Sequence, residues 1–202
     1  MTRFDRSPRF QRSMLAGILC GALSFSSLAA LKQGDAAPDF TAQAALAGKE
    51  FSYSLKAALQ RGPVVVYFYP SAFTGGCNIQ AHTFALNQDK FTAAGATIVG
   101  VSLDSIARLD DFSADPNYCA GKIPVASDPD GSIAKSYALS IRDAMPGKTD
   151  TRGAEIGHAF AERTTFVVTR DGKVAAVLGG LAPADNVEKT LEAVQALPKA
   201  GP

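Results

Sequence analysis

The sequence predicts a single α/β domain whose central sheet is mixed, with helices on both faces. Two continuous runs of β-branched and aromatic residues, at 63–69 and 96–103, flank a helix-compatible segment, which is a βαβ arrangement with parallel strands. Later in the chain, residues 164–169 and 173–178 flank Asp171-Gly172, a dipeptide typical of a tight hairpin, so antiparallel strands join the same sheet.

The composition agrees with one globular domain. The chain has 202 residues, of which 47% are apolar and 19% charged, with 18 Gly and 11 Pro, so extensive disorder and collagen-like repetition are excluded. Residues 32–40 form a polar, proline-containing lead-in, and the pattern after Gly48 is too short to assign. No internal repeat or low-complexity linker divides residues 31–198.

The first long apolar run, PVVVYFY at 63–69, is bounded by Gly62 and Pro70 and predicts a strand that is covered on both faces. The segment that follows it, residues 77–94, carries Phe84 and Phe91 seven positions apart, on one face of a helix.

The second half alternates in the same way. We expect a helical stretch from Ser105 towards Tyr118, a short strand at 123–126, a turn at the DPDG of 128–131 and helical turns at 132–137. After the hairpin, Pro183 begins a terminal packing helix.

The charge balance excludes whole classes of partner. The chain holds 20 Lys and Arg against 19 Asp and Glu, but four of those Arg and one Asp lie in the first 12 residues, which leaves 16 basic and 18 acidic residues in the rest. Phosphate binding needs clustered positive charge, so we expect no nucleic-acid or anionic membrane partner, and instead a small molecule or a protein.

The N-terminus has the order of an export signal. Four Arg precede an uncharged apolar segment at 14–30, and the small residues Ser27 and Ala29 suit cleavage after Ala29. We therefore expect residues 1–29 to be a signal peptide and residues 30–202 to be the mature domain, exported to the periplasm without stable membrane association. The alternative is an uncleaved anchor, although the segment is slightly short of the about 20 apolar residues that span a bilayer.

Export changes the interpretation of the three cysteines. Cys20 lies in the segment to be removed, so Cys77 and Cys119 are the two thiols of the mature chain, in a compartment where disulfides persist.

The segment YFYPSAFTGGCNIQ places Cys77 where a buried strand gives way to a helix. The unpaired N–H groups at a helix N-terminus stabilise a thiolate, which is the reactive form of cysteine. The alternative is a buried cysteine that acts as a small apolar side chain. Because Thr and Gly residues rather than core residues surround Cys77, the sequence favours a reactive thiol.

These residues resemble the peroxiredoxins, thiol peroxidases of the AhpC/TSA type, and in particular their bacterioferritin-comigratory-protein or PrxQ-like group. Pro70, Thr74 and Cys77 have the spacing of the family's Pro-x-x-x-Thr-x-x-Cys motif. LKQGDAAPDF resembles the family's lead-in, SDPDGSIAKSY its middle turn, and ERTTFVVTRDGKV the segment that carries its active-site arginine, here Arg163. Gly75 departs from the motif, which usually has proline after the threonine, and is expected to loosen the loop.

The resemblance implies a thioredoxin-like fold and a peroxidase without cofactor or metal. Cys77 would attack the peroxide as a thiolate, and Arg163 would stabilise the charge on sulfur and on the breaking O–O bond. Thr74 would supply a hydroxyl, the backbone N–H groups of Gly76 and Cys77 would bind the substrate oxygens, and Pro70 would shield the thiolate from water. Taken singly, Thr74 suits a helix cap, Pro70 a strand terminator and Arg163 a surface charge.

The resemblance leaves the second thiol step open. In one subgroup the resolving cysteine lies five residues after the first, where this chain has His82, whereas Cys119 resembles subgroups that resolve from the next helix. We expect Cys119 to condense with the Cys77 sulfenic acid into an intramolecular disulfide. The alternative is one-cysteine chemistry, in which an external thiol reduces Cys77. The expected partners are a hydroperoxide and a thioredoxin-like or small-thiol electron donor, and the expected state is a monomer or homodimer.

Three other classes are weaker. Thioredoxin-type exchange needs a second cysteine where Gln80 stands, and His82 and His158 lack metal-ligand spacing, so no metal is expected. A third possibility is a non-catalytic exported binding module in which Cys77 and Cys119 form a structural disulfide.

Overall fold

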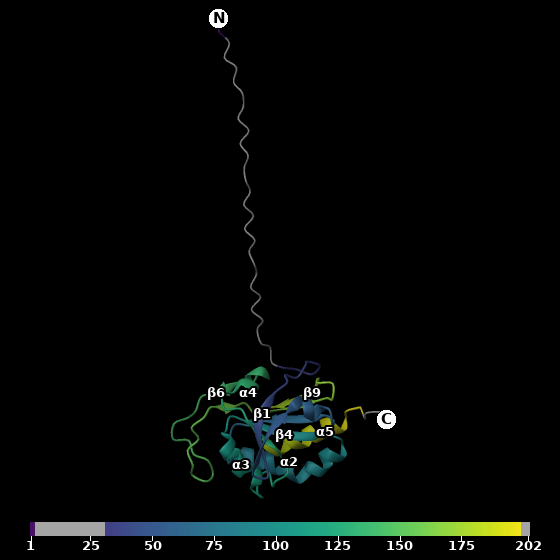
Figure 1. The fold of residues 1–202 in the computed structure, drawn as a ribbon, viewed down its shortest axis with the longest axis vertical. Helices are drawn as coiled ribbons and strands as arrows, with labels where there is room; N and C mark the ends of the chain where they lie inside the picture. The colour runs from purple at the N-terminus through teal and green to yellow at the C-terminus, as the bar shows by residue number, and fades with distance from the viewer. Residues whose placement is uncertain (3–30, 199–202) are drawn as a thin grey trace.

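The computed structural model describes residues 1–2 and 31–198, and a mixed sheet forms its centre (Figure 1). Its strands are β1 Thr41–Leu46, β2 Lys49–Ser54, β3 Val64–Phe68, β4 Thr97–Ser102, β5 Val125–Ser127, β6 Ile141–Arg142, β7 Phe160–Ala161, β8 Thr164–Val168 and β9 Val174–Gly179. Its helices are α1 Leu55–Leu59, α2 Gly75–Ala93, α3 Ile106–Ala114, α4 Ser132–Ser136 and α5 Pro183–Gln195. The predicted signal peptide falls almost wholly outside the described residues.

The sheet has seven strands in the order β2-β1-β5-β4-β3-β8-β9, and β6 pairs separately with β7. The strands β3, β4 and β5 run parallel, as the βαβ pattern predicted. On one side β8 pairs antiparallel with β3 and β9 antiparallel with β8. On the other side β1 pairs antiparallel with β5 and β2 antiparallel with β1. The predicted mixed sheet with helices on both faces, and the thioredoxin-like fold, are therefore confirmed.

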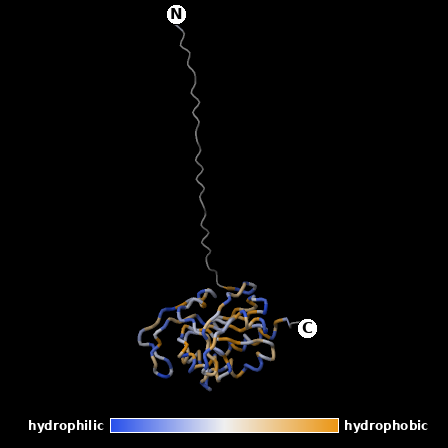
Figure 2. Tube along the Cα trace, in the orientation of Figure 1, coloured by the Kyte–Doolittle hydropathy of each residue, from blue (hydrophilic) through white to orange (hydrophobic). Residues whose placement is uncertain are grey.

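Strand β3 is buried along its whole length and divides the core into two layers. Val65 and Tyr67 point to the face covered by α2, α3 and α5, where the Tyr67 ring stacks on Phe84 with centroids 4.6 Å apart. Val66 and Phe68 point to the opposite face, which α1 and α4 cover. This alternation explains the unbroken apolar run, and hydrophobic residues gather along the central strands in Figure 2.

Two helix boundaries differ from the prediction. Helix α2 begins at Gly75, two residues before the expected start, so Cys77 lies inside its first turn. Helix α3 ends at Ala114 and does not continue towards Tyr118. The reason is Pro116, which disfavours a helical conformation at Asp115, and Asp115 has extended backbone angles, φ −63° and ψ 123°. Cys119 therefore lies in a loop and not on the helix that was expected to carry it.

The hairpin of β1 and β2 was not predicted. Its turn places Ala47 and Gly48 in a left-handed conformation, with φ 53° and 72°. Alanine adopts this conformation rarely, and Ala-Gly is not one of the dipeptides, such as Asn-Gly or Asp-Gly, that usually indicate a hairpin turn. Its strands also carry alanine, lysine and glutamate, which are weak strand formers.

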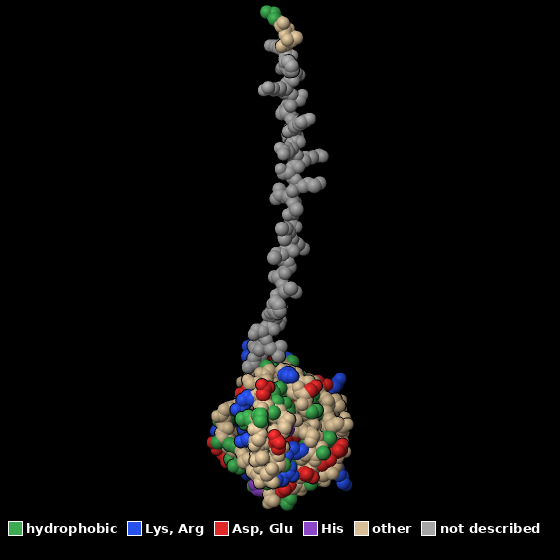
Figure 3. Space-filling model, turned by 90° about the vertical axis from the view of Figure 1, so that its left-hand side faces the viewer, with side chains coloured by type: hydrophobic (Ala, Val, Ile, Leu, Met, Phe, Trp, Pro, Cys, Tyr) green, Lys and Arg blue, Asp and Glu red, His purple; other side chains and the backbone are tan. Residues whose placement is uncertain are grey.

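Charges of both signs are scattered over the face shown in Figure 3. Among the residues that the structure describes, no helix combines the length and the apolar character needed to cross a membrane.

Candidate active site

The sheet register brings two distant segments together at one end of β3. Phe68, the last residue of β3, pairs with Thr164, the first residue of β8. Because the two strands are antiparallel, Arg163 lies beside the segment that leaves β3 and enters α2. The chain reverses there through residues 70–74, so the start of α2 faces the start of β8.

Cys77 occupies the first turn of α2 and its side chain is buried, with 2% of its surface exposed. The guanidinium of Arg163 donates from Nη2 to the Cys77 Sγ at 3.3 Å. The N–H groups of the first turn of a helix have no carbonyl of their own helix to bond, so their partial positive charge adds to that of the arginine. Both features stabilise negative charge on the sulfur.

Gly76 allows the arginine to approach the helix this closely. A Cβ atom at this position would lie 3.1 Å from Arg163 Nη2 and 3.3 Å from Pro183 Cγ, at the start of α5. At Gly75 a Cβ would meet no atom within 4 Å. A side chain at position 76 would therefore displace Arg163 or Pro183 slightly, whereas position 75 has room for one.

Gln80, one helical turn after Cys77, is a site residue that the sequence analysis missed. It is fully buried, and its Oε1 accepts a hydrogen bond from Arg163 Nη1, so the two arms of the guanidinium contact Gln80 and Cys77. Its Nε2 donates in turn to Asn186 of α5 at 2.9 Å. The i, i+3 spacing from Cys77 could have indicated that Gln80 shares its face of α2.

Thr74 is the residue that precedes the first turn of α2, but its hydroxyl does not cap the helix. Instead, Thr74 Oγ1 donates to the carbonyl of Ser71 at 2.8 Å, which closes the loop between β3 and α2. Pro70 is half-buried at the beginning of that loop. The Thr74 side chain therefore does not act as the helix cap that the sequence alone allowed.

A buried charged cluster fixes the backbone of this loop from behind. Asp104, which follows β4, accepts from the Ala72 N–H at 2.8 Å and from Ser71 Oγ at 3.0 Å. Arg108 bonds Asp104 through Nε at 2.8 Å and donates through Nη2 to the Ala72 carbonyl at 2.9 Å. Ala72 is thus held at both its backbone donor and its backbone acceptor.

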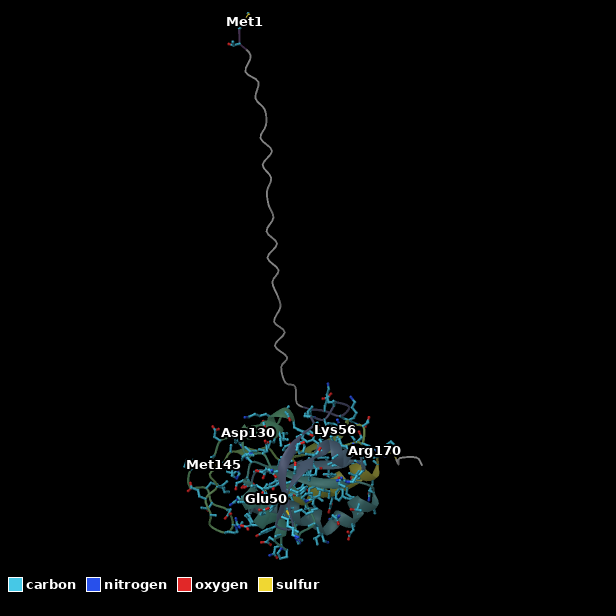
Figure 4. All side chains as sticks on the ribbon, viewed as in Figure 1. Met1, Glu50, Lys56, Asp130, Met145 and Arg170 are labelled. Atoms are coloured by element: carbon cyan, nitrogen blue, oxygen red, sulfur yellow. The ribbon has the colours of Figure 1, made fainter. Side chains whose placement is uncertain are left out.

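The neighbouring Phe73 is held by the long loop that precedes β7, whose outer residue Met145 is labelled in Figure 4. The Phe73 carbonyl accepts from the Thr151 N–H and from Thr151 Oγ1, each at 2.8 Å. The Arg152 guanidinium lies 3.2 Å from the centroid of the Phe73 ring, a cation–π contact. These contacts hold Phe73 at φ 58°, which is unfavourable for a bulky residue.

His158 completes the cluster. Its Nε2 lies 2.8 Å from Asp104 Oδ1 and its Nδ1 lies 2.7 Å from the Ala159 carbonyl, so both ring nitrogens face acceptors. Burial alone disfavours the charged ring, but the hydrogen bond and charge of Asp104 outweigh it and raise the pKa of His158. Conversely, burial disfavours the Asp104 carboxylate, and the bond and charge of His158 outweigh that cost and lower its pKa.

Cys119 is fully buried in the same apolar layer as Cys77, and the two are free thiols. Burial, and next the charge of Asp115, raise the pKa of Cys119. Tyr118, its neighbour, packs edge-on against Phe73 with centroids 5.5 Å apart, which links the Cys119 loop to the Cys77 loop. The expected disulfide is not formed in this structure.

No group of three or more potential metal ligands occurs within residues 1–2 and 31–198. His158 is engaged by Asp104, and His82 lies on α2, so the structure does not bring the two histidines into one metal-ligand group.

A thioredoxin-like sheet with a cysteine in the first turn of the helix after β3, facing an arginine just before the neighbouring strand β8, is typical of a thiol enzyme. The AhpC/TSA family matches residues 33–177. A putative peroxiredoxin of Mycobacterium tuberculosis is 37% identical over 145 residues, which are 71% of this chain and 82% of that protein. Peroxiredoxin Bcp of Xanthomonas campestris is 30% identical over 133 residues, 66% of this chain and 76% of the relative.

Solved structures agree with these relatives. The crystal structure of peroxidoxin BcpB from Mycobacterium tuberculosis has a TM-score of 0.69 at 26% identity and covers 84% of this chain and 99% of its own. Peroxiredoxin Q of Xanthomonas campestris has a TM-score of 0.61 at 28% identity, over 76% and 89%. The chain therefore belongs to the AhpC/TSA family and is similar to its Bcp and PrxQ members, which supports a thiol-dependent peroxidase activity.

The packing at Gly76 generates a first prediction. Gly76→Ala will push the Arg163 guanidinium away from the Cys77 sulfur and slow the reaction of Cys77 with hydrogen peroxide by about tenfold or more. Gly75→Ala is the matched control, because both substitutions favour the helix while only one meets the arginine. Stopped-flow oxidation of the reduced proteins measures the difference, and equal rates for the two variants contradict the packing argument.

The pair of His158 and Asp104 predicts a pH dependence of stability. A raised pKa of His158 in the folded state means that its contribution is complete below about 6.5, the unfolded value, and is lost as pH rises through the folded value. The free energy of unfolding, measured by denaturant titration, should therefore fall as pH increases above about 6.5.

His158→Gln should remove this fall, whereas His82→Gln, which changes the other histidine of the described residues, should retain it. A wild-type protein whose unfolding free energy stays constant across this range would show that folding does not raise the pKa of His158.

Proposed function

We propose that this protein reduces hydrogen peroxide and organic hydroperoxides through a Cys77 sulfenic acid, with Cys119 as the resolving thiol. The observation that carries the proposal is the 3.3 Å contact between Arg163 Nη2 and the Cys77 sulfur, at the positive end of α2. A permanently charged donor beside the sulfur favours the thiolate, and the thiolate is the nucleophile in peroxide reduction.

In the first step the Cys77 thiolate attacks one oxygen of the O–O bond. An S–O bond forms, the O–O bond breaks, sulfur loses two electrons and the peroxide gains them. The hydroxyl hydrogen of the hydroperoxide remains on the new sulfenic acid, and the departing alkoxide or hydroxide takes a proton from solvent. Arg163 stabilises the charge that moves from sulfur to the leaving oxygen.

Other residues of the loop would orient the substrate. The backbone N–H groups of Gly76 and Cys77 are the proposed donors to the peroxide oxygens, since the first turn of α2 leaves such groups without helical partners. Thr74 would supply a hydroxyl beside them, and Pro70 would limit the access of water. The geometry that supports these roles is the proximity of residues 74–77 in one turn.

In the second step the Cys119 thiol attacks the Cys77 sulfenic acid. An S–S bond forms, the S–O bond breaks and water leaves. Cys119 is buried and its raised pKa disfavours the thiolate, so its loop and the Cys77 loop must first open locally. Left-handed backbone at Phe73 and Ala120, with φ 58° and 52°, supports such opening because non-glycine residues are strained there.

The proposal also includes an electron donor, a substrate class and export. A thioredoxin-like protein or a small thiol would reduce the disulfide and restore two thiols for each peroxide consumed. The bacterioferritin comigratory protein of Xanthomonas campestris, a solved relative, has alkyl peroxide reduction activity, which supports organic hydroperoxides as substrates here. Residues 1–29 would export the protein, a proposal that rests on the sequence alone.

The binding-module alternative is not favoured. It requires a structural disulfide between Cys77 and Cys119, and the two are free thiols, each buried in the apolar core. A structural pair would also give no reason for a half-buried arginine that donates to one of its sulfurs.

The proposed roles of the two thiols predict different effects for their serine variants. Cys77→Ser should abolish peroxide consumption, whereas Cys119→Ser should still be oxidised once at Cys77 at about the wild-type rate and then accumulate the sulfenic acid. In wild-type protein treated with peroxide, mass spectrometry should find a peptide that links Cys77 to Cys119. Turnover without this peptide would exclude the intramolecular route and favour one-cysteine chemistry.

A further inference from the structure

Behind Arg163 a chain of buried polar side chains crosses from α2 to α5 and ends at β9. Gln80 accepts from Arg163 Nη1 and donates from Nε2 to Asn186 Oδ1 at 2.9 Å. Asn186 donates from Nδ2 to the backbone carbonyl of Leu178 at 3.0 Å. Gln80 and Asn186 have at most 1% of their surface exposed, so water has little access to the bond between these two amides.

The two ends of this chain allow only one direction of its hydrogen bonds. A guanidinium donates and never accepts, and a backbone carbonyl accepts and never donates. Leu178 therefore takes the amino group of Asn186, which turns the Asn186 oxygen towards the Gln80 amino group. The Gln80 oxygen is then left to face Arg163. Thr165 Oγ1 also donates to Asn186 Oδ1, at 2.7 Å.

We propose that Asn186 is a positioning residue for the reaction of Cys77: with the Leu178 carbonyl it fixes the orientation of Gln80, and Gln80 aims the Arg163 guanidinium at the sulfur. The proposal deepens the peroxidase function above and rests on it, although its central measurement does not use peroxide.

Orientation matters because Gln80 has two different ends. If its amide turned over, an amino group would face the guanidinium, and two donors would meet with no acceptor between them. Arg163 would then leave its position to find another acceptor and would lose its contact with the Cys77 sulfur. A neutral amide at this position, unlike a carboxylate, also leaves the positive charge of Arg163 to act on the thiolate.

The test uses Asn186→Leu, which keeps the branching of the side chain at Cγ but forms no hydrogen bond. Thr190→Val is the control: Thr190 is buried on the same helix and donates at 2.6 Å to the Asn186 backbone carbonyl, outside the chain that reaches Arg163. The readouts are the rate of Cys77 alkylation by iodoacetamide as a function of pH, and the rate of Cys77 oxidation by hydrogen peroxide, both in a Cys119→Ser background.

In the leucine variant we expect the alkylation profile to move to higher pH and peroxide oxidation to slow by about tenfold, which is less than the roughly 100-fold that complete loss of a transition-state donor causes. Thr190→Val should leave both readouts near those of the parent, even where its melting temperature falls. A leucine variant that keeps the parent's alkylation profile and oxidation rate overturns the proposal.

If Asn186→Leu does not fold, Asn186→Asp tests the same positioning role. A protonated carboxyl can accept from Gln80 and donate to Leu178, as the amide does, whereas an ionised carboxylate cannot donate. We expect the reactivity of Cys77 to equal that of the parent at low pH and to fall below it at higher pH. Reactivity that follows the parent at every pH overturns the role of Asn186. A third outcome separates the two proposals: the Asn186 variant shows altered alkylation, but the parent protein does not reduce peroxide. This result would reject the proposed peroxidase function and support the positioning role of Asn186.

Discussion

The contact between the Arg163 guanidinium and the Cys77 sulfur is the interaction on which the rest of the site depends. Removing a sulfur from water disfavours its charged form, and Cys77 is almost fully buried. A fixed guanidinium and the positive end of α2 offset that cost at the place where the charge must form. The fold supplies both because antiparallel pairing of β3 with β8 brings the start of β8 beside the start of α2.

Two different kinds of support surround this contact. On the side of α5, neutral amides hold the arginine, so its charge is not taken up by a carboxylate. On the side of α3, a charged cluster centred on Asp104 and Arg108 holds the backbone of the loop that carries Thr74. The first arrangement sets the electrostatics at the sulfur. The second fixes a loop that must nevertheless open when Cys119 reacts.

The strands and helices of the β3 to β5 region, and the β8–β9 hairpin, were predictable because apolar runs and the Asp171-Gly172 turn are local signals. The Cys77 and Arg163 pair was predictable from motifs in the resemblance. The end of α3 could have been predicted from Pro116, because a proline disfavours a helical conformation at the residue before it. Gln80 and Asn186 were not predicted, since each resembles an ordinary helix residue until α2 and α5 pack together and bury both.

The most direct test of this account is the fraction of Cys77 present as thiolate at neutral pH, measured by ultraviolet absorbance in a Cys119→Ser background with Arg163 and with Arg163→Gln. The account predicts that loss of the guanidinium lowers the thiolate fraction and slows oxidation by hydrogen peroxide by about 100-fold. A variant with an unchanged thiolate fraction and an unchanged rate would contradict it.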